Sequence, residues 1–131
     1  MTGLDTNLLV RFFMQDDWDQ SARVDTVMQS LTIENPGWVG IATLMELVWV
    51  LTSTYKETRS CVLGVLDSLL SSEEVVVENP EVVREAIEGY RKSNVGFADC
   101  LIASSARAAG CGVILTFDEM AVRKLGMKLV P

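Results

Sequence analysis

The segment Val113-Ile114-Leu115-Thr116-Phe117-Asp118 decides the fold, because an uncharged and largely apolar run ends there in an aspartate. Gly110 and Gly112 bracket the turn that precedes it, and a short apolar run of this kind predicts a buried strand. The N-terminal segment Thr2-Gly3-Leu4-Asp5 has the same form, a candidate strand that ends at an acid. Two strands that each end in a carboxylate indicate a binding or catalytic site at one edge of a sheet.

Between these segments, short β-branched runs alternate with stretches of helical spacing. Helices are predicted over residues 7–13, about 17–30, 41–55, 58–70, 80–92 and 97–109 and shortly after Asp118, and further strands at 38–39, 75–77 and 128–130. Pro36-Gly37 breaks the chain, and Pro80 suits the first turn of a helix. This alternation predicts an α/β fold in which helices cover both faces of a parallel sheet. Ligands of such sheets bind beyond the carboxyl ends of the strands, where Asp5 and Asp118 fall.

The length and composition predict one domain over residues 1–131. The chain has no Pro/Gly/Ser-rich linker, and its size suffices to bury a core. It shows neither a leader-like N-terminus nor an apolar run that would span a bilayer, so we expect a cytoplasmic protein that does not enter a membrane. Cys61, Cys100 and Cys111 have neither zinc-ligand nor redox-motif spacing, so we predict buried, reduced thiols.

Charge and residue content narrow the chemistry. The net charge of -7 argues against a protein that binds nucleic acid through clustered cations alone. It does not exclude a metal-dependent nuclease, because divalent cations reverse the potential of an acidic pocket. The absence of histidine removes Ser-His and Cys-His nucleophiles and most catalytic zinc sites. Carboxylate and metal chemistry remain.

Four acids, Asp5, Glu46, Asp99 and Asp118, lie inside or at the end of apolar segments. Glu46 is the only charge from Trp38 to Leu51, and Asp99 is the only one between Lys92 and Arg107. Isolated charges in buried surroundings are costly unless they are paired or bind metal, so the four acids call for a common explanation.

Each acid also has a purely structural interpretation. Asp5 and Asp118 suit turns or helix caps, and Asp99 suits the first turn of a helix, where the dipole favours acids. Glu46 is harder to explain in this way, because it falls near the middle of its helix and has no Lys or Arg three or four residues away.

Four strings in the sequence resemble the PIN-domain family, specifically the VapC-like toxins of toxin-antitoxin pairs. They cover essentially the whole chain: Gly3-Leu4-Asp5-Thr6-Asn7-Leu8-Leu9-Val10-Arg11, Leu44-Met45-Glu46-Leu47-Val48-Trp49-Val50-Leu51, Phe97-Ala98-Asp99-Cys100-Leu101-Ile102-Ala103 and Leu115-Thr116-Phe117-Asp118. The resemblance implies a three-layer PIN-like fold with a parallel five-stranded sheet flanked by helices. It also implies a metal-dependent endoribonuclease that cleaves RNA and is restrained by an antitoxin protein.

The resemblance carries the catalytic and metal-ligand roles onto Asp5, Glu46, Asp99 and Asp118. Mg2+ or Mn2+ would suit such carboxylate oxygens. Supporting or substrate-contacting roles fall to Thr6, Asn7, Thr116 and Arg11, although Arg11 suits a surface salt bridge equally well. One departure concerns Gly96, because many VapC-like relatives have a further Asp at that position. Its absence leaves open whether one or two ions bind.

Two other functions compete with the ribonuclease. A PIN-like module that has lost efficient catalysis and only binds a partner is compatible with Gly96. A haloacid-dehalogenase-like phosphatase also places an Asp after its first strand, but the second Asp that it needs two residues later is Asn7 here. The helix 41–55 is apolar almost all round and includes Trp49, which predicts that a second subunit covers it and that the protein is a homodimer.

Overall fold

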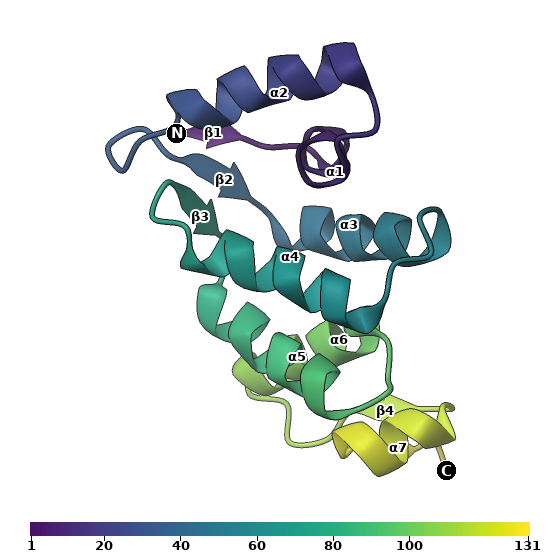
Figure 1. The fold of residues 1–131 in the computed structure, drawn as a ribbon. Coiled ribbons are helices and arrows are strands. Elements are labelled where there is room, and N and C mark those ends of the chain that lie inside the picture. The colour runs from purple at the N-terminus through teal and green to yellow at the C-terminus, as the bar shows by residue number, and fades with distance from the viewer. The chain divides into compact units, whose positions relative to one another are not determined.

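The computed structural model describes residues 1–131 and divides into two compact units, unit 1 (Met1–Glu78) and unit 2 (Asn79–Pro131). Each unit has its own parallel sheet: unit 1 contains a three-stranded sheet and unit 2 a two-stranded one (Figure 1). None of the helices has the length and apolar character needed to cross a membrane.

Unit 1 is built on strands β1 (Thr2–Gly3), β2 (Gly37–Val39) and β3 (Val75–Val77), in that order across the sheet. Gly37 packs closely, because a Cβ atom there would lie 2.6 Å from Cδ1 of Leu4 and would displace that side chain. Four helices join these strands: α1 (Thr6–Met14), α2 (Trp18–Ser30), α3 (Ile41–Ser53) and α4 (Arg59–Ser71). Helix α1 packs against α2 and α3, and α4 packs against β3.

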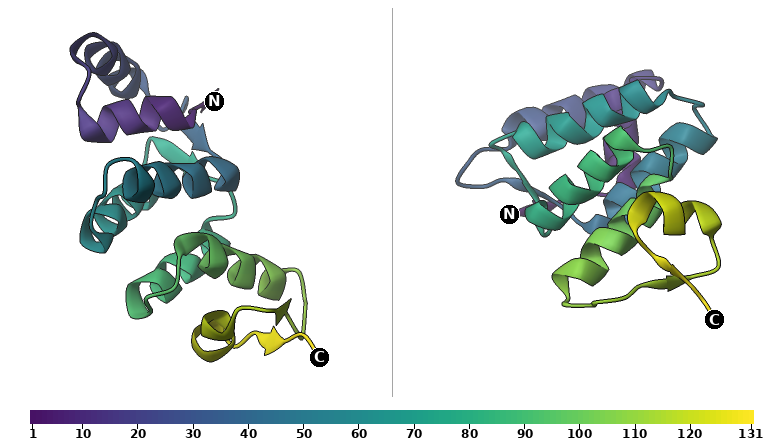
Figure 2. Two further views of the ribbon diagram at one scale, coloured as in Figure 1. Left: turned by 90° about the vertical axis from the view of Figure 1, so that its right-hand side faces the viewer. Right: turned by 90° about the horizontal axis from the view of Figure 1, so that it is seen from below.

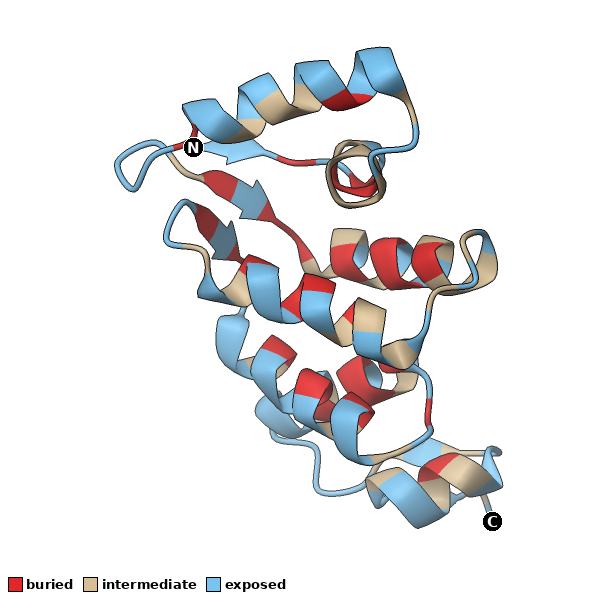
Figure 3. Cartoon of the chain, in the orientation of Figure 1, coloured by how far each residue is buried: buried red, intermediate tan, exposed pale blue.

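The starts of two of these helices follow from cap residues. The carboxylate of Asp17 accepts a hydrogen bond from the amide of Gln20 at the start of α2, and the Thr58 hydroxyl accepts one from the amide of Cys61 at the start of α4. Each bond satisfies an amide that has no partner within its helix. Buried leucines, Leu44, Leu47 and Leu51, line one side of α3 (Figure 3).

Unit 2 consists of α5 (Pro80–Lys92), α6 (Phe97–Ala108), β4 (Leu115–Thr116), α7 (Glu119–Leu125) and β5 (Lys128–Leu129). Helices α5 and α6 pack along each other, and α7 lies against the β4–β5 pair (Figure 2). Ser104 on α6 is fully buried, and its hydroxyl donates to the carbonyl oxygen of Val82 on α5 at 2.6 Å. A small core joins α6 and α7 through Ala103, Ala121 and Met127.

The α/β class with parallel strands is confirmed, and three predictions about its details are wrong. The five strands form a three-stranded and a two-stranded sheet rather than one five-stranded sheet. The strand predicted over 113–116 is shortened to β4, and Val113, Leu115 and Phe117 are exposed rather than buried. All three cysteines are free, but only Cys100 is buried, because Cys61 is partly exposed and Cys111 is exposed.

Candidate active site

Asp5 lies between β1 and α1, at the carboxyl end of the first strand. It occupies the N-cap of α1, but its exposed carboxylate accepts no capping hydrogen bond from that helix. The next residue, Thr6, is 3% exposed, and its Oγ1 atom is buried without a hydrogen-bond partner. Such orphaned groups are uncommon and costly. The strand–helix junction therefore presents a carboxylate that capping leaves free and, beside it, an unsatisfied hydroxyl.

Glu46 lies in the middle of α3, on the face opposite the buried leucines. Its side chain is exposed and forms no ion pair or hydrogen bond within unit 1. Trp49, one turn further along, is 64% exposed. The carboxylate of Glu78 at the end of β3 accepts a hydrogen bond from the amide of Ile41 at 2.9 Å. Glu78 thus satisfies an amide in the first turn of the helix that carries Glu46.

Asp99 lies in the first turn of α6, and Gly96 is the N-cap of that helix. The Asp99 side chain is partly exposed, and Gly96 supplies no side chain to cap the helix. A Cβ atom built on Gly96 would lie 4.0 Å from Oδ2 of Asp99, with no other heavy atom within that distance. The space beside the Asp99 carboxylate is therefore open on this side.

Asp118 follows β4 and caps α7. Its Oδ1 atom accepts hydrogen bonds from the amides of Met120 at 2.8 Å and Ala121 at 3.4 Å. The Thr116 hydroxyl accepts a hydrogen bond from the amide of Asp118 at 3.0 Å, which fixes the turn between strand and helix. The structural interpretation of Asp118 as a cap is therefore confirmed. Capping occupies Oδ1 and leaves Oδ2 free, so a metal-ligand role is still compatible with this geometry.

The four acids are divided between the units, two in each. Neither unit by itself brings together three acidic or cysteine side chains that could hold a metal ion. The expectation that the acids are buried is wrong for this structure, because Asp5, Glu46 and Asp118 are exposed and Asp99 is partly exposed. The donor set nevertheless fits a hard divalent cation, because it consists of carboxylates with oxygens that no protein cation occupies.

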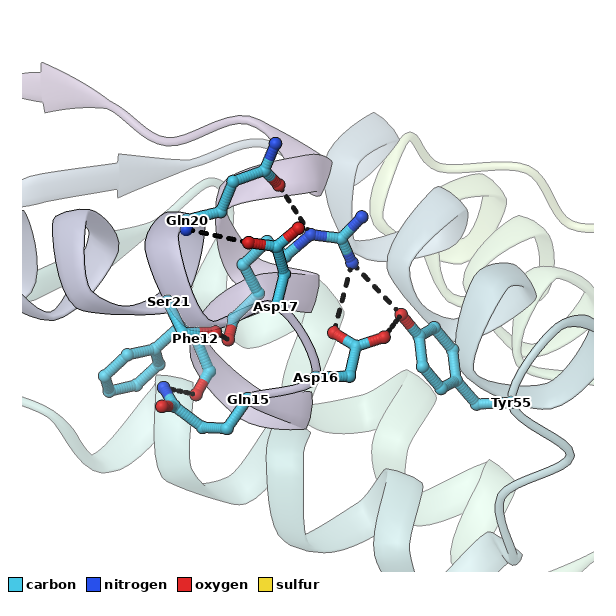
Figure 4. A network of polar contacts seen from close by, with 8 residues as sticks. Phe12, Gln15, Asp16, Asp17, Gln20, Ser21 and Tyr55 are labelled. Atoms are coloured by element: carbon cyan, nitrogen blue, oxygen red, sulfur yellow. Dashed lines mark hydrogen bonds and ion pairs between the residues drawn. The ribbon is translucent and has the colours of Figure 1, made fainter.

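Arg11 belongs to a polar network that joins α1, the turn after it, α2 and the end of α3 (Figure 4). Its Nη1 atom donates to Asp16 at 3.3 Å and to the Tyr55 hydroxyl at 3.1 Å, and its Nε atom donates to Gln20 at 2.7 Å. Tyr55 in turn donates to Oδ2 of Asp16 at 2.6 Å. The salt bridge considered for Arg11 is therefore present. Nothing in the sequence pointed to Tyr55 or to Glu78, because both act on residues distant along the chain.

The network shifts the acidities of its members. The hydrogen bond from Tyr55 lowers the pKa of Asp16, and the Arg11 charge acts in the same direction. The same hydrogen bond raises the pKa of Tyr55, with burial adding to the effect. Both shifts favour the ionised Asp16 and the protonated Tyr55, the pair of states that this hydrogen bond requires.

Comparisons with known proteins identify the family of the chain. Residues 4–126, which include parts of both units, match the family model described as "PIN domain". The chain is also similar to a VapC ribonuclease from Aquifex aeolicus (strain VF5), with 31% identity over 134 residues that cover 99% of this chain and 96% of that protein. Both matches extend over nearly the whole sequence. The chain therefore belongs to the PIN-domain family and is a VapC-like protein.

Proposed function

We propose that this protein is a metal-dependent endoribonuclease that hydrolyses phosphodiester bonds in RNA. The observation that carries the proposal is the placement of Asp5 and Asp118, each at the carboxyl end of a parallel strand and at the start of the next helix. Loops in this position are the usual ligand sites of α/β proteins. Membership of the PIN-domain family and the similarity to a VapC ribonuclease support the same activity.

In this proposal Asp5, Glu46, Asp99 and Asp118 together hold Mg2+ or Mn2+. The ion would supply Lewis-acid assistance, since it polarises the phosphodiester and makes a nearby water more acidic. Asp5 and Asp99, whose carboxylates make no cap or ion pair within their units, bind most directly. Asp118 binds through the oxygen that does not cap α7. Thr6 and Asn7 orient the first acid or the scissile phosphate, and Thr116 holds the turn of Asp118.

The decisive experiment measures cleavage of labelled RNA by the purified protein in Mn2+, in Mg2+ and in chelator. We expect cleavage only with metal, and we expect Asp5→Asn to abolish it. Glu34→Gln is the matched control, because Glu34 is an exposed acid of unit 1 outside the proposed site. Cleavage that persists in chelator, or that Glu34→Gln and Asp5→Asn reduce equally, would contradict the proposal. Sequencing the cut ends of wild-type reactions would identify the preferred RNA.

Gly96 keeps a second function under consideration, that of a protein-interaction module with weak or no catalysis. The position beside Asp99 has no side chain, so the donor set near the start of α6 is one carboxylate smaller than in many VapC-like relatives. Wild-type protein that binds a partner but cuts no RNA in any divalent metal would favour the module over the enzyme.

Two protein partners complete the proposal. A cognate antitoxin would restrain the enzyme in the cytoplasm, and we expect it to insert an Arg or Lys among the four acids, since a guanidinium pairs bidentately with carboxylates. An antitoxin that binds Glu46→Gln as tightly as wild type, whichever of its basic residues is replaced, would contradict this insertion.

A second copy of the chain would cover Trp49 on α3 and form a homodimer. Light scattering at micromolar concentration tests the homodimer, and a monomer would contradict it.

A further inference from the structure

Charge is distributed unequally between the two units. Unit 1 contains four Lys and Arg residues against twelve Asp and Glu, a net charge of -8. Unit 2 contains seven against six, a net charge of +1. The overall charge of -7 therefore comes from unit 1, and an anion would meet little net repulsion from unit 2.

Within unit 2, the cations differ in their partners. Those on α5 and α6 form local ion pairs: Arg84 pairs with Glu81, Arg91 and Lys92 share Glu88, and Arg107 pairs with Glu85. The other three cations, Arg123, Lys124 and Lys128, form no ion pair and no side-chain hydrogen bond. Their charge is therefore available to a ligand.

These three cations belong to one short stretch, the last turn of α7 and the strand β5 that follows it. All three are exposed. Helix α7 begins at Asp118, one of the proposed metal ligands, and β5 is paired with β4, the strand that leads to it. A hollow of about 360 Å³ lined by Glu119, Val122, Arg123 and Leu129 lies between α7 and β5. Two unpaired cations thus lie in the last turn of the helix that Asp118 caps, and the third lies on the strand paired with β4.

The helix dipole accounts for only part of this pattern. The helix dipole stabilises cations in the last turn of a helix, which suffices to explain Arg123 and Lys124 as structural residues. Lys128 lies outside α7, in a strand, where no such effect operates. A polyanion that passes along this surface would use all three.

We propose that Arg123, Lys124 and Lys128, here called the basic surface, bind the phosphate backbone of the RNA substrate on one side of the scissile bond. This inference rests on the proposed ribonuclease function. RNA is favoured as the occupant by charge complementarity, and because the basic surface lies on the helix that Asp118 caps and on the strand paired with β4. Backbone contacts of this kind give affinity without base preference and are weakened by salt.

The test compares a triple variant, Arg123→Gln, Lys124→Gln and Lys128→Gln, with a charge-matched control, Lys56→Gln, Arg84→Gln and Lys92→Gln. Binding of a labelled single-stranded RNA is measured by fluorescence anisotropy in chelator, between about 50 and 200 mM salt. Each phosphate contact on a single strand contributes roughly 0.7 to the slope of log Kd against log salt, so loss of the basic surface lowers that slope by about 2. We expect RNA affinity at low salt to fall on the order of tenfold or more in the triple variant and much less in the control.

Cleavage in Mn2+ gives a second measurement. The triple variant should raise KM and leave kcat nearly unchanged, because it removes binding that is equal in substrate and transition state. Lys128→Gln alone, which leaves α7 intact, should show the same trend if the triple variant folds poorly.

Equal losses in the triple variant and the control would overturn the proposal. RNA binding that is unchanged while binding of a protein inhibitor is lost would also overturn it and assign the surface to that inhibitor. Wild-type protein that binds RNA through the basic surface but cuts none in metal would instead contradict the ribonuclease function.

Discussion

Gly96 occupies a position where the sequence resemblance leads us to expect an Asp, and its place in the structure makes this departure testable. It occupies the N-cap of α6, where a side-chain acceptor would normally satisfy an amide of the first turn. A Cβ atom there would point toward open space 4.0 Å from the Asp99 carboxylate. An acidic side chain at this position would therefore both cap the helix and add a ligand next to Asp99.

We expect Gly96→Asp to increase the rise in melting temperature that Mn2+ produces, relative to wild type. Gly96→Asn is the matched control, because Asn caps a helix about as well as Asp but brings no charge. In chelator the Asp variant should melt no higher than the Asn variant, since its carboxylate faces Asp99 without a counter-ion. Equal responses of the two variants to Mn2+ would show that position 96 does not face a metal site.

Asp118 has two roles that substitution can separate at the level of the element α7. Asp118→Ala removes the hydrogen bonds to Met120 and Ala121 and should cost about 1 kcal/mol of stability in chelator. Asp118→Asn preserves an acceptor for the cap and should therefore not lower stability in chelator, yet both variants should lose the response to Mn2+. Urea unfolding in chelator and in Mn2+ measures both effects. An Asn variant that keeps the full metal response would show that Asp118 is a cap only.

Tyr55 connects the end of α3 to α1, so its hydroxyl contributes a directional contact that apolar packing between these helices lacks. Tyr55→Phe should lower the melting temperature by a few degrees near neutral pH, and Asp16→Asn should do the same. The hydrogen bond from Tyr55 lowers the pKa of Asp16 in the folded protein. This bond therefore stabilises the fold fully above the unfolded pKa of Asp16, and the stabilisation is lost as pH falls through the folded pKa of Asp16. Because the hydrogen bond to Asp16 raises the pKa of Tyr55, this stabilisation is also lost as pH rises through the raised folded pKa of Tyr55.

Melting curves from acid to alkaline pH test this dependence. The difference between wild type and Tyr55→Phe should be largest on a plateau between the two titrations and should shrink at both ends. A difference that does not change with pH would show that the hydroxyl acts through packing rather than through the ionised Asp16.

The elements with local signals could be predicted from the sequence, and those that depend on distant partners could not. Pro80, Asp17 and Thr58 mark helix starts that the structure places where they were expected. By contrast, the apolar run 113–117 predicted a buried strand, whereas Val113, Leu115 and Phe117 are exposed. An apolar run indicates only that burial is favourable, and it does not identify the segment that would cover it. The sequence contains no local pattern that predicts the hydrogen bond between Glu78 and the amide of Ile41 at the start of α3, because 37 positions separate these two residues.

At the scale of the whole molecule, the sequence predicted the α/β class but not the pairing of its strands. Strand pairing depends on contacts between distant segments, and two-residue strands such as β1 and β4 have little pattern to fix their partners. The single domain over residues 1–131 stays a prediction, although the family model includes parts of both units. The four acids were identified from their isolation in apolar segments, whereas their exposure was not, because a pattern of neighbours along the chain does not report solvent access.

The proposed convergence of the four acids on one ion has a thermodynamic consequence that requires no knowledge of the substrate. Carboxylates that share a site repel one another without metal, and this repulsion opposes folding. Asp99→Asn and Asp118→Asn should therefore melt at or above the wild-type temperature in chelator, although most substitutions destabilise. Excess Mn2+ should reverse the order, because a ligand that binds only the folded state adds about 2.7 kcal/mol at a hundred times its dissociation constant.

The measurement is a set of thermal melts of wild type and the two variants, each in chelator and in excess Mn2+. Glu34→Gln serves as the control, since it removes one negative charge from an exposed position away from the proposed ligands. If repulsion in the whole molecule were responsible, this control would gain as much stability in chelator as the site variants. If the acids were independent surface groups, Mn2+ would move none of the curves. Only a shared site gives stabilisation in chelator, loss of the Mn2+ response and an unaffected control together.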